Sequence, residues 1–262
     1  MIRGIYSAVS GMNLQMAVVD TASGNLNNAN LPGYKKDWVE AKPFLELVQL
    51  SSRQRDALTD ALTGLSMHKP LGITNQGAQI ERVFTDFAPG DPRETGKKTD
   101  FALQGPGFFT LVNPANDDEV FYTRNGSFSL DQAGYLVNDN GFRVMGQNGP
   151  VQVTDVNSLM VDEYGNVMEN DDTTGVLNIV TFDNLLELVG VGNNLYQAPE
   201  QEARVVENPG LRQGFLEAAN VDAVKEITDI IAATRAYETG QRIIQAQDGF
   251  LDTAINKVGV LR

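Results

Sequence analysis

The hydrophobic period of this chain changes twice along its length, and that change restricts the possible folds more than any other feature. Over positions 2–26, apolar residues fall at alternating steps of three and four, which is the spacing of a helix seam. A heptad spacing returns over 223–258, beside small residues. From Ile73 to Val206, turn-forming Gly, Pro, Asn and Asp interrupt the chain roughly every 8–12 residues. Long terminal helices around a strand-rich middle are therefore predicted.

The seam residues are the candidate assembly interface. They are Ile2, Ile5, Val9, Met12, Met16, Val19 and Leu26 at one end and Ile230, Tyr237, Ile244, Leu251 and Val258 at the other. A helix longer than a small domain must bury its stripe against another long helix or another chain. Two interpretations stay open from periodicity: each helix packs on the chain's own core, or both ends form a coiled coil that repeats across subunits.

We expect an α+β fold in which the long N- and C-terminal α-helices form a coiled-coil-like layer and the centre is an all-β, hairpin-rich domain. The expected divisions are a helix and Asn-rich turn for assembly (1–36), a connecting arm (37–72), an outer all-β domain (73–209) and a C-terminal assembly helix (210–262). Because Ser51-Ser52-Arg53-Gln54-Arg55 breaks the apolar pattern of 40–70, that stretch is interpreted as either a helix or a mobile arm.

The charge balance argues against several partners. The chain has 262 residues with 20 Lys and Arg against 34 Asp and Glu, a net charge of −14, so nucleic acid and anionic membrane surfaces would repel it. Residues 1–36 and 210–262 are almost neutral, so the acidity lies in the middle. No window is apolar enough for a membrane-spanning helix, and polar residues interrupt any signal-peptide core near the start.

The chain has few of the Cys and His residues that often serve in catalytic and metal sites. With no Cys and one His, the chain cannot form a disulfide framework, a thiolate zinc site, a Cys nucleophile or a site that needs two imidazoles. His68 is interpreted as a solvated loop residue, and Gly105-Pro106-Gly107 as a turn, because a strand-like run follows it. The acidic stretches 116–119 and 169–172 lack calcium-loop spacing and are interpreted as solvated hairpin tips, with a weak ion site left open. No catalytic, cofactor-binding or metal-binding residue is predicted.

The most unusual local feature is an asparagine-rich run from Ser23 to Lys35. Asn side chains bond nearby backbone and tolerate left-handed conformations, and Pro32-Gly33 forces a turn, so the helix must end here. The run resembles the N-terminal motif of flagellar basal-body rod and hook proteins. It matches at Ser23, Asn25, Leu26, Asn28, Asn30, Pro32, Gly33, Tyr34 and Lys35 and departs at Gly24, Asn27 and Leu31.

Three later blocks resemble the same family in the same order. They are 85–109, with Thr99-Asp100-Phe101-Ala102-Leu103-Gln104-Gly105; 122–146, with Tyr122-Thr123-Arg124-Asn125-Gly126; and 211–238, with Leu211-Arg212-Gln213-Gly214-Phe215-Leu216-Glu217-Ala218-Ala219-Asn220. The resemblance implies a distal or proximal rod subunit that polymerises into a helical, torque-transmitting tube. It also implies contacts with neighbouring rod and hook proteins, export through the flagellar type III apparatus without a cleavable signal peptide, and an extracytoplasmic place in the basal body.

Two competing functions stay open beside it. An acidic, β-rich enzyme that cleaves glycans would need a pair of carboxylates in a cleft, which a single sequence does not reveal. A monomeric binding or adhesion module would keep the β-domain but would not need long apolar termini.

Overall fold

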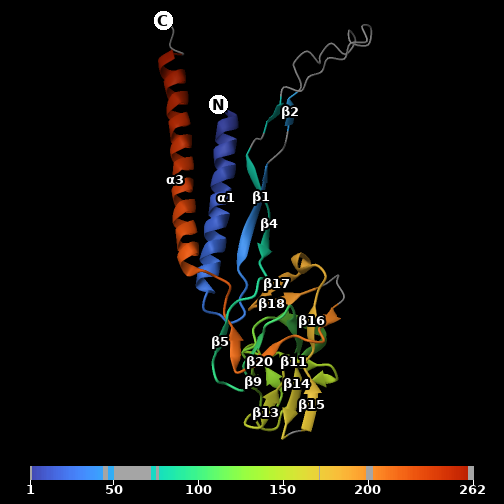
Figure 1. Cartoon of the computed structure of the whole chain (residues 1–262). Helices are drawn as coiled ribbons and strands as arrows, with labels where there is room; N and C mark the ends of the chain where they lie inside the picture. The colour runs from blue at the N-terminus through green and yellow to red at the C-terminus, as the bar shows by residue number, and fades with distance from the viewer. Residues whose placement is uncertain are drawn as a thin grey trace, which may run out of the picture. The chain divides into compact units, whose positions relative to one another are not determined.

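The computed structural model describes residues 2–43, 47–49, 72–74, 77–170, 172–198 and 203–258 (Figure 1). His68 and most of the predicted arm lie outside the described residues. The chain divides into two compact units. The helical unit comprises Met1–Ser23, Trp38–Phe84 and Lys225–Arg262, and the strand unit comprises Gly24–Asp37 and Thr85–Val224.

The described residues of the helical unit form two long helices and two strand pairs. Helix α1 runs over Ile2–Asn27 and helix α3 over Ala223–Thr253, followed by one π-helical turn at Ala254–Val258. Strands β1 (Asp37–Pro43) and β4 (Ala78–Thr85) pair, as do β2 (Leu47–Gln49) and β3 (Gly72–Thr74). Neither helix contains proline, which would interrupt its hydrogen bonds. No helix in the described part of the chain is long and apolar enough to span a membrane.

Helices α1 and α3 lie side by side in opposite directions (Figure 1). Gly4 lies against the Gln247 side chain, and Gly240 lies so close to α1 that a Cβ there would be 2.6 Å from Met12 Cγ. The less exposed face of α3 repeats every three or four residues: Glu226, Ile230, Ala233, Tyr237, Gly240, Ile244, Gln247 and Leu251. Helix α1 also contacts the β1–β4 pair, since Ser10 Oγ accepts a 3.2 Å hydrogen bond from Ala78 N.

The predicted coiled-coil-like layer was wrong. The body of the chain is strand-rich, and the mixed α+β class fits only in part. Val9 and Met16, both seam positions, are 40% and 50% exposed. A coiled coil needs large apolar knobs at each seam position, whereas the less exposed face of α3 includes Glu226, Ala233 and Gly240. These polar and small residues allow a close helix contact but cannot supply regular knobs.

The strand unit is built mostly from antiparallel hairpins. Its strands are β5 (Pro92–Glu94), β6 (Phe101–Leu103), β7 (Phe108–Asn113), β8 (Asn116–Thr123), β9 (Ser129–Leu130), β10 (Leu136–Val137), β11 (Arg143–Gly146), β12 (Gly149–Pro150), β13 (Leu159–Val161), β14 (Asn166–Glu169), β15 (Asp172–Val176), β16 (Ile179–Thr181), β17 (Val189–Gly192), β18 (Leu195–Gln197), β19 (Arg204–Val205), β20 (Leu211–Gln213) and β21 (Phe215–Glu217). A short 3-10 turn covers Leu185–Glu187. The largest sheet follows the order β17-β18-β8-β7-β11-β10-β9, with β16 beside β7. Strands β13, β14 and β15 form a second sheet, and β20–β6 and β21–β5 form two pairs.

Two apolar clusters hold the strand unit together. The larger is formed by inward side chains of the sheets, including Phe101, Phe109, Leu111 and Leu136. The smaller surrounds Phe108, whose ring meets Phe87 edge-on at 5.3 Å between centroids. Alternate strand residues point to one face, so short alternating runs are enough to build these clusters.

Candidate functional site: a buried polar hub and the faces of the terminal helices

The asparagine-rich turn is closed by the side chain of Asn25, which is buried. Its Oδ1 accepts hydrogen bonds from Asp37 N at 2.9 Å and from Tyr34 Oη at 3.1 Å. Its Nδ2 donates to Asp37 O at 2.8 Å. The amide therefore satisfies both backbone groups of Asp37, as a neighbouring strand would, and fixes where the chain leaves the turn.

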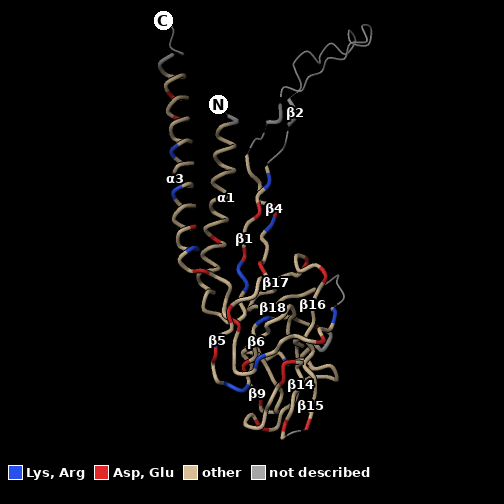
Figure 2. The backbone as a smooth tube through the Cα atoms, viewed as in Figure 1, with Lys and Arg blue, Asp and Glu red and all other residues tan. Residues whose placement is uncertain are grey.

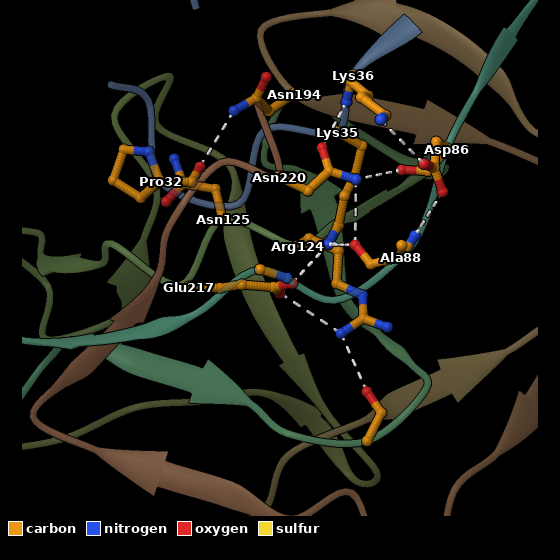
Figure 3. Close-up of polar contacts among 12 residues, drawn as sticks. Pro32, Lys35, Lys36, Asp86, Ala88, Arg124, Asn125, Asn194, Glu217 and Asn220 are labelled. Carbon is orange, nitrogen blue, oxygen red and sulfur yellow. Dashed lines mark hydrogen bonds and ion pairs between the residues drawn. The ribbon is translucent and has the colours of Figure 1, made fainter. Parts of the chain in front are cut away.

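Pro32 and Gly33 form the point of closest approach between this turn and the rest of the strand unit. Gly33 has φ +65°, and a Cβ there would lie 2.4 Å from the carbonyl carbon of Arg124. Its N–H donates to Glu217 O at 2.7 Å. The Pro32 carbonyl accepts from Asn194 Nδ2 at 3.2 Å, as Figure 3 shows. Only glycine combines this backbone conformation with such a close contact.

Lys35, two residues after Gly33, forms a buried ion pair with Glu217. Lys35 Nζ lies 2.5 Å from Glu217 Oε1, and the two side chains are 0% and 2% exposed (Figure 3). The same ammonium donates to Ala88 O at 2.7 Å, and Glu217 Oε1 also accepts from Gly90 N at 2.8 Å. Buried charges are stable only when paired and hydrogen-bonded in this way.

Arg124 is a second buried cation at the same carboxylate. Its Nη1 lies 3.5 Å from Glu217 Oε2 and donates to Gly105 O at 3.0 Å. Burial lowers the pKa of both Lys35 and Arg124, and the charge of Glu217 partly offsets that effect. One carboxylate therefore holds two desolvated cations.

Asn220 completes what we call the hub: Asn25, Gly33, Lys35, Arg124, Glu217 and Asn220 with their bonded partners. Asn220 Oδ1 accepts from Lys36 N at 2.8 Å, and its Nδ2 donates to Asp86 O at 2.8 Å. Nearby, Thr85 Oγ1 donates to Asp37 Oδ1 at 2.6 Å. Burial raises the pKa of Asp37, and this hydrogen bond partly counters the rise.

The hub holds segments that are distant in the sequence together within the strand unit. Its charged and amide groups bond to backbone and to one another across segments 25–37, 85–90, 124 and 217–220. In the described part of the chain, no three His, Asp or Glu side chains converge to hold a metal ion. The hub joins the residues that follow α1 to those that precede α3.

The structure places the predicted seam residues on more than one kind of surface. Ile5, Met12, Val19, Leu26, Ile230, Tyr237, Ile244 and Leu251 are half-buried, and Val9 and Met16 are exposed. The side chains of Ile2 and Val258 lie outside the described residues. Of the predicted turn motif, Asn25 and Gly33 are buried, Asn28, Pro32 and Tyr34 are half-buried, and Asn30 is exposed.

Sequence reasoning missed two groups of residues. The first is the charged and amide part of the hub, Lys35, Arg124, Glu217 and Asn220; all four lie inside blocks that carried the family resemblance, which was the available signal. The second is a set of large apolar side chains that are exposed on the terminal helices outside the predicted seams: Tyr6, Val224, Ile227, Ile231, Ile243, Phe250 and Ile255.

Comparison with descriptions of known protein families identifies the class of protein to which this chain belongs. Three family descriptions match successive parts of the chain: "Flagella basal body rod protein" at residues 5–35, "Flagellar hook protein FlgE/F/G D1 domain" at 102–169 and "Flagellar basal body rod FlgEFG protein C-terminal" at 212–257. Together they mark a protein of the flagellar rod and hook class.

Similarity to individual proteins identifies the family within this class. The flagellar basal-body rod protein FlgG of Bacillus subtilis (strain 168) is 31% identical, with 98% of this chain and 99% of the relative covered. FlgG of Borreliella burgdorferi is 32% identical, with 98% of each chain covered. The flagellar hook-basal body complex protein FlhO of B. subtilis is 27% identical, with 99% of each covered. The chain belongs to the flagellar basal-body rod protein family and is a structural subunit of the rod of the flagellar basal body.

Proposed function

We propose that this subunit polymerises through its terminal helices into a helical tube that transmits torque. The carrying observation is that helices α1 and α3 belong to one unit whose apolar side chains are incompletely buried: Tyr6 is 68% exposed and Phe250 is 70% exposed. Large apolar side chains that remain exposed together in one unit are typical of protein interfaces. The predicted seam residues, from Ile2 to Leu26 and from Ile230 to Val258, contribute to this assembly region.

We assign a separate role to each of the predicted segments of the chain. Residues 1–36 and 210–262 serve assembly, 37–72 is a connecting arm, and 73–209 is the outer domain. Nearly all the net negative charge lies between the two end segments. Acidic outer surfaces would repel one another, and almost neutral ends would permit close contact.

We further infer the setting in which the subunit works. It reaches an extracytoplasmic position in the basal body through the flagellar type III export apparatus, and it contacts neighbouring rod and hook proteins. It acts by assembly and not by catalysis. Family membership supports these points, and the hub supports the last, because its charged groups bond within the chain.

The test is a concentration series on the purified full chain, followed by sedimentation velocity and electron microscopy. We expect oligomers or filaments that grow with concentration, alone or on a nucleus of other rod proteins. In a motile host that lacks its own subunit of this kind, expression of the chain should restore swimming. A chain that stays monomeric with and without a rod nucleus, and that restores no motility, would overturn the proposal.

A further inference from the structure

An uncharged groove runs between helix α1 and strand β4 in the helical unit. Its volume is about 650 Å³, and its lining residues are Tyr6, Val9, Ser10, Asn13, Ala78, Gln79 and Ile80. None of these side chains is charged. Along α1, Figure 2 shows an almost uniformly tan tube, because Arg3 and Asp20 are the charged residues of that helix. We call this cavity the α1–β4 groove.

Helix α3 carries an uncharged exposed stripe beside the face that packs on α1. The stripe consists of Ala232, Ala236, Thr239, Ile243 and Phe250, all exposed. Their spacing places them on one side of a helix with 3.6 residues per turn. The opposite flank has exposed Ile227 and Ile231, but charged Glu238 and Arg242 interrupt it. The stripe from Ala232 to Phe250 is therefore the flank of α3 that no charged residue interrupts.

Charge and shape make the two surfaces complementary. Copies of a chain with net charge −14 repel one another, so contact is most favourable where both surfaces are uncharged. The groove is concave, and the stripe is the convex side of a helix. Alanines at 232 and 236 permit close approach of the helix backbone, and Ile243 and Phe250 supply apolar volume to fill the groove.

We propose that the α3 stripe of one copy seats in the α1–β4 groove of the next copy. This inference rests on the proposed polymerisation and specifies its contact. It extends the assembly surface beyond residues 1–36 and 210–262 to residues 78–80 of β4, which belong to the helical unit. The seam residues Ile230, Tyr237 and Ile244 face inward and are half-buried within one chain, so they are less available to a neighbour than Ile243 and Phe250. Because groove and stripe are different surfaces of the same subunit, their contact is heterologous, and repeated contacts of this kind build an open filament when the rotation between copies does not close a ring. A helical filament, as proposed for this subunit, is the open case.

The absence of cysteine from the chain allows a direct crosslinking test. Val9→Cys chains mixed with Ile243→Cys chains, polymerised and oxidised, should give a disulfide-linked dimer that contains one chain of each kind. Because each variant carries a single thiol, any crosslink must join two chains. The matched control is Val9→Cys mixed with Arg242→Cys, an adjacent exposed position on another side of α3, which should crosslink at least about tenfold less. Equal crosslinking at 242 and 243 would overturn the pairing.

A charge placed in the stripe provides the second test. Ile243→Asp should keep wild-type helicity by circular dichroism, since the position is exposed, but should reduce polymer yield at least about tenfold, because burial of a carboxylate against the groove is costly. Gln245→Asp adds the same charge on the other flank and should polymerise normally.

The outcomes separate the two proposals. If wild-type chains polymerise and Ile243→Asp polymerises equally well, the groove-stripe contact is wrong but polymerisation stands. If Val9→Cys chains, mixed with a cysteine-bearing rod protein of another kind, form a disulfide with that protein and not with Ile243→Cys chains, the occupant of the groove is that protein and not a second copy. If the wild type assembles neither alone nor on a rod nucleus, the proposed function itself fails.

Discussion

Glu217 is the residue on which the hub most depends, because its one carboxylate serves two buried cations. Lys35 bonds to one oxygen, and Arg124 lies near the other. Removing one partner from a buried pair leaves an uncompensated charge, which costs far more than loss of an exposed pair. Lys42 and Glu81 form such an exposed pair in the helical unit, so the same chain offers both cases.

Lys35→Met should therefore lower the free energy of unfolding by about 3 kcal/mol, since the more distant Arg124 is then the one cation left beside Glu217 in the hub. Lys42→Met is the matched control and should cost less than about 1 kcal/mol. Urea unfolding of both full-length variants measures the difference. Equal losses would show that the hub pair contributes no more than a surface pair.

Gly33 provides a second test at the same scale. Gly33→Ala should lower the free energy of unfolding by about 2 to 3 kcal/mol, because it combines a left-handed φ with a Cβ placed against the Arg124 backbone. Gly96 has φ +72° but nothing within 4 Å of a built Cβ. Gly96→Ala should therefore cost about 1 kcal/mol, from backbone strain alone. If the two variants unfold alike, the close contact at residue 33 is not a constraint.

At the scale of elements, the pairing of α1 with α3 depends on small residues as much as on apolar ones. Gly240 lies against Met12, and Gly4 lies against Gln247. A heptad stripe identifies the less exposed side of α3, but Gly240 on that side permits an approach that a regular coiled coil would not have. The β1–β4 pair then covers another part of α1, through Ser10 and Ala78.

Gly240→Leu should weaken this packing, because even a Cβ would lie 2.6 Å from Met12 Cγ and a larger side chain must displace the helix. Overpacking of this kind costs about 1 to 3 kcal/mol. Gly249→Leu is the control on the same helix, where nothing lies within 4 Å, and better helix propensity should raise stability by up to about 1 kcal/mol. Thermal unfolding followed by circular dichroism should show opposite shifts; a rise for both variants would contradict the close helix contact.

At the scale of the whole molecule, buried titratable groups make stability depend on pH. Burial raises the pKa of Tyr122 and Tyr196 above the ordinary value of 10.0, whereas it lowers that of Lys35 from 10.5. A raised tyrosine pKa means that, above pH 10, the folded chain keeps a proton that the unfolded chain releases. A lowered lysine pKa has the opposite sign, because the folded chain releases its proton first and the cost of burial is relieved.

The free energy of unfolding should therefore fall as pH rises above 10, mainly through the tyrosines. Tyr196→Phe should remove up to about 1.4 kcal/mol per pH unit from that slope. Chemical denaturation at a series of pH values from 9 to 11.5 measures it, with Tyr164→Phe at an exposed position as control. An unchanged slope in Tyr196→Phe would show that this hydroxyl does not contribute to the alkaline loss of stability.

Local residue patterns were sufficient to predict part of this protein. The change from heptad spacing to frequent turns indicated where helices and strands lie, because side-chain period and turn chemistry are properties of neighbouring residues. The run from Ser23 to Lys35, with the three later blocks, indicated the family. The end of α1 at Asn27 likewise agrees with the asparagine-rich run that follows it.

The tertiary structure alone decided which distant residues meet. Lys35 and Glu217 are separated by 182 positions, and no periodicity relates them, so their ion pair could not be derived from spacing. The coiled-coil prediction failed for a similar reason: a heptad pattern gives one face of a helix, but the residues on the partner and the competing β1–β4 pair determine how that face packs. Sequence alone determined local conformation and family, whereas the buried hub and the apolar faces left exposed on the helices depend on long-range burial of charge and surface.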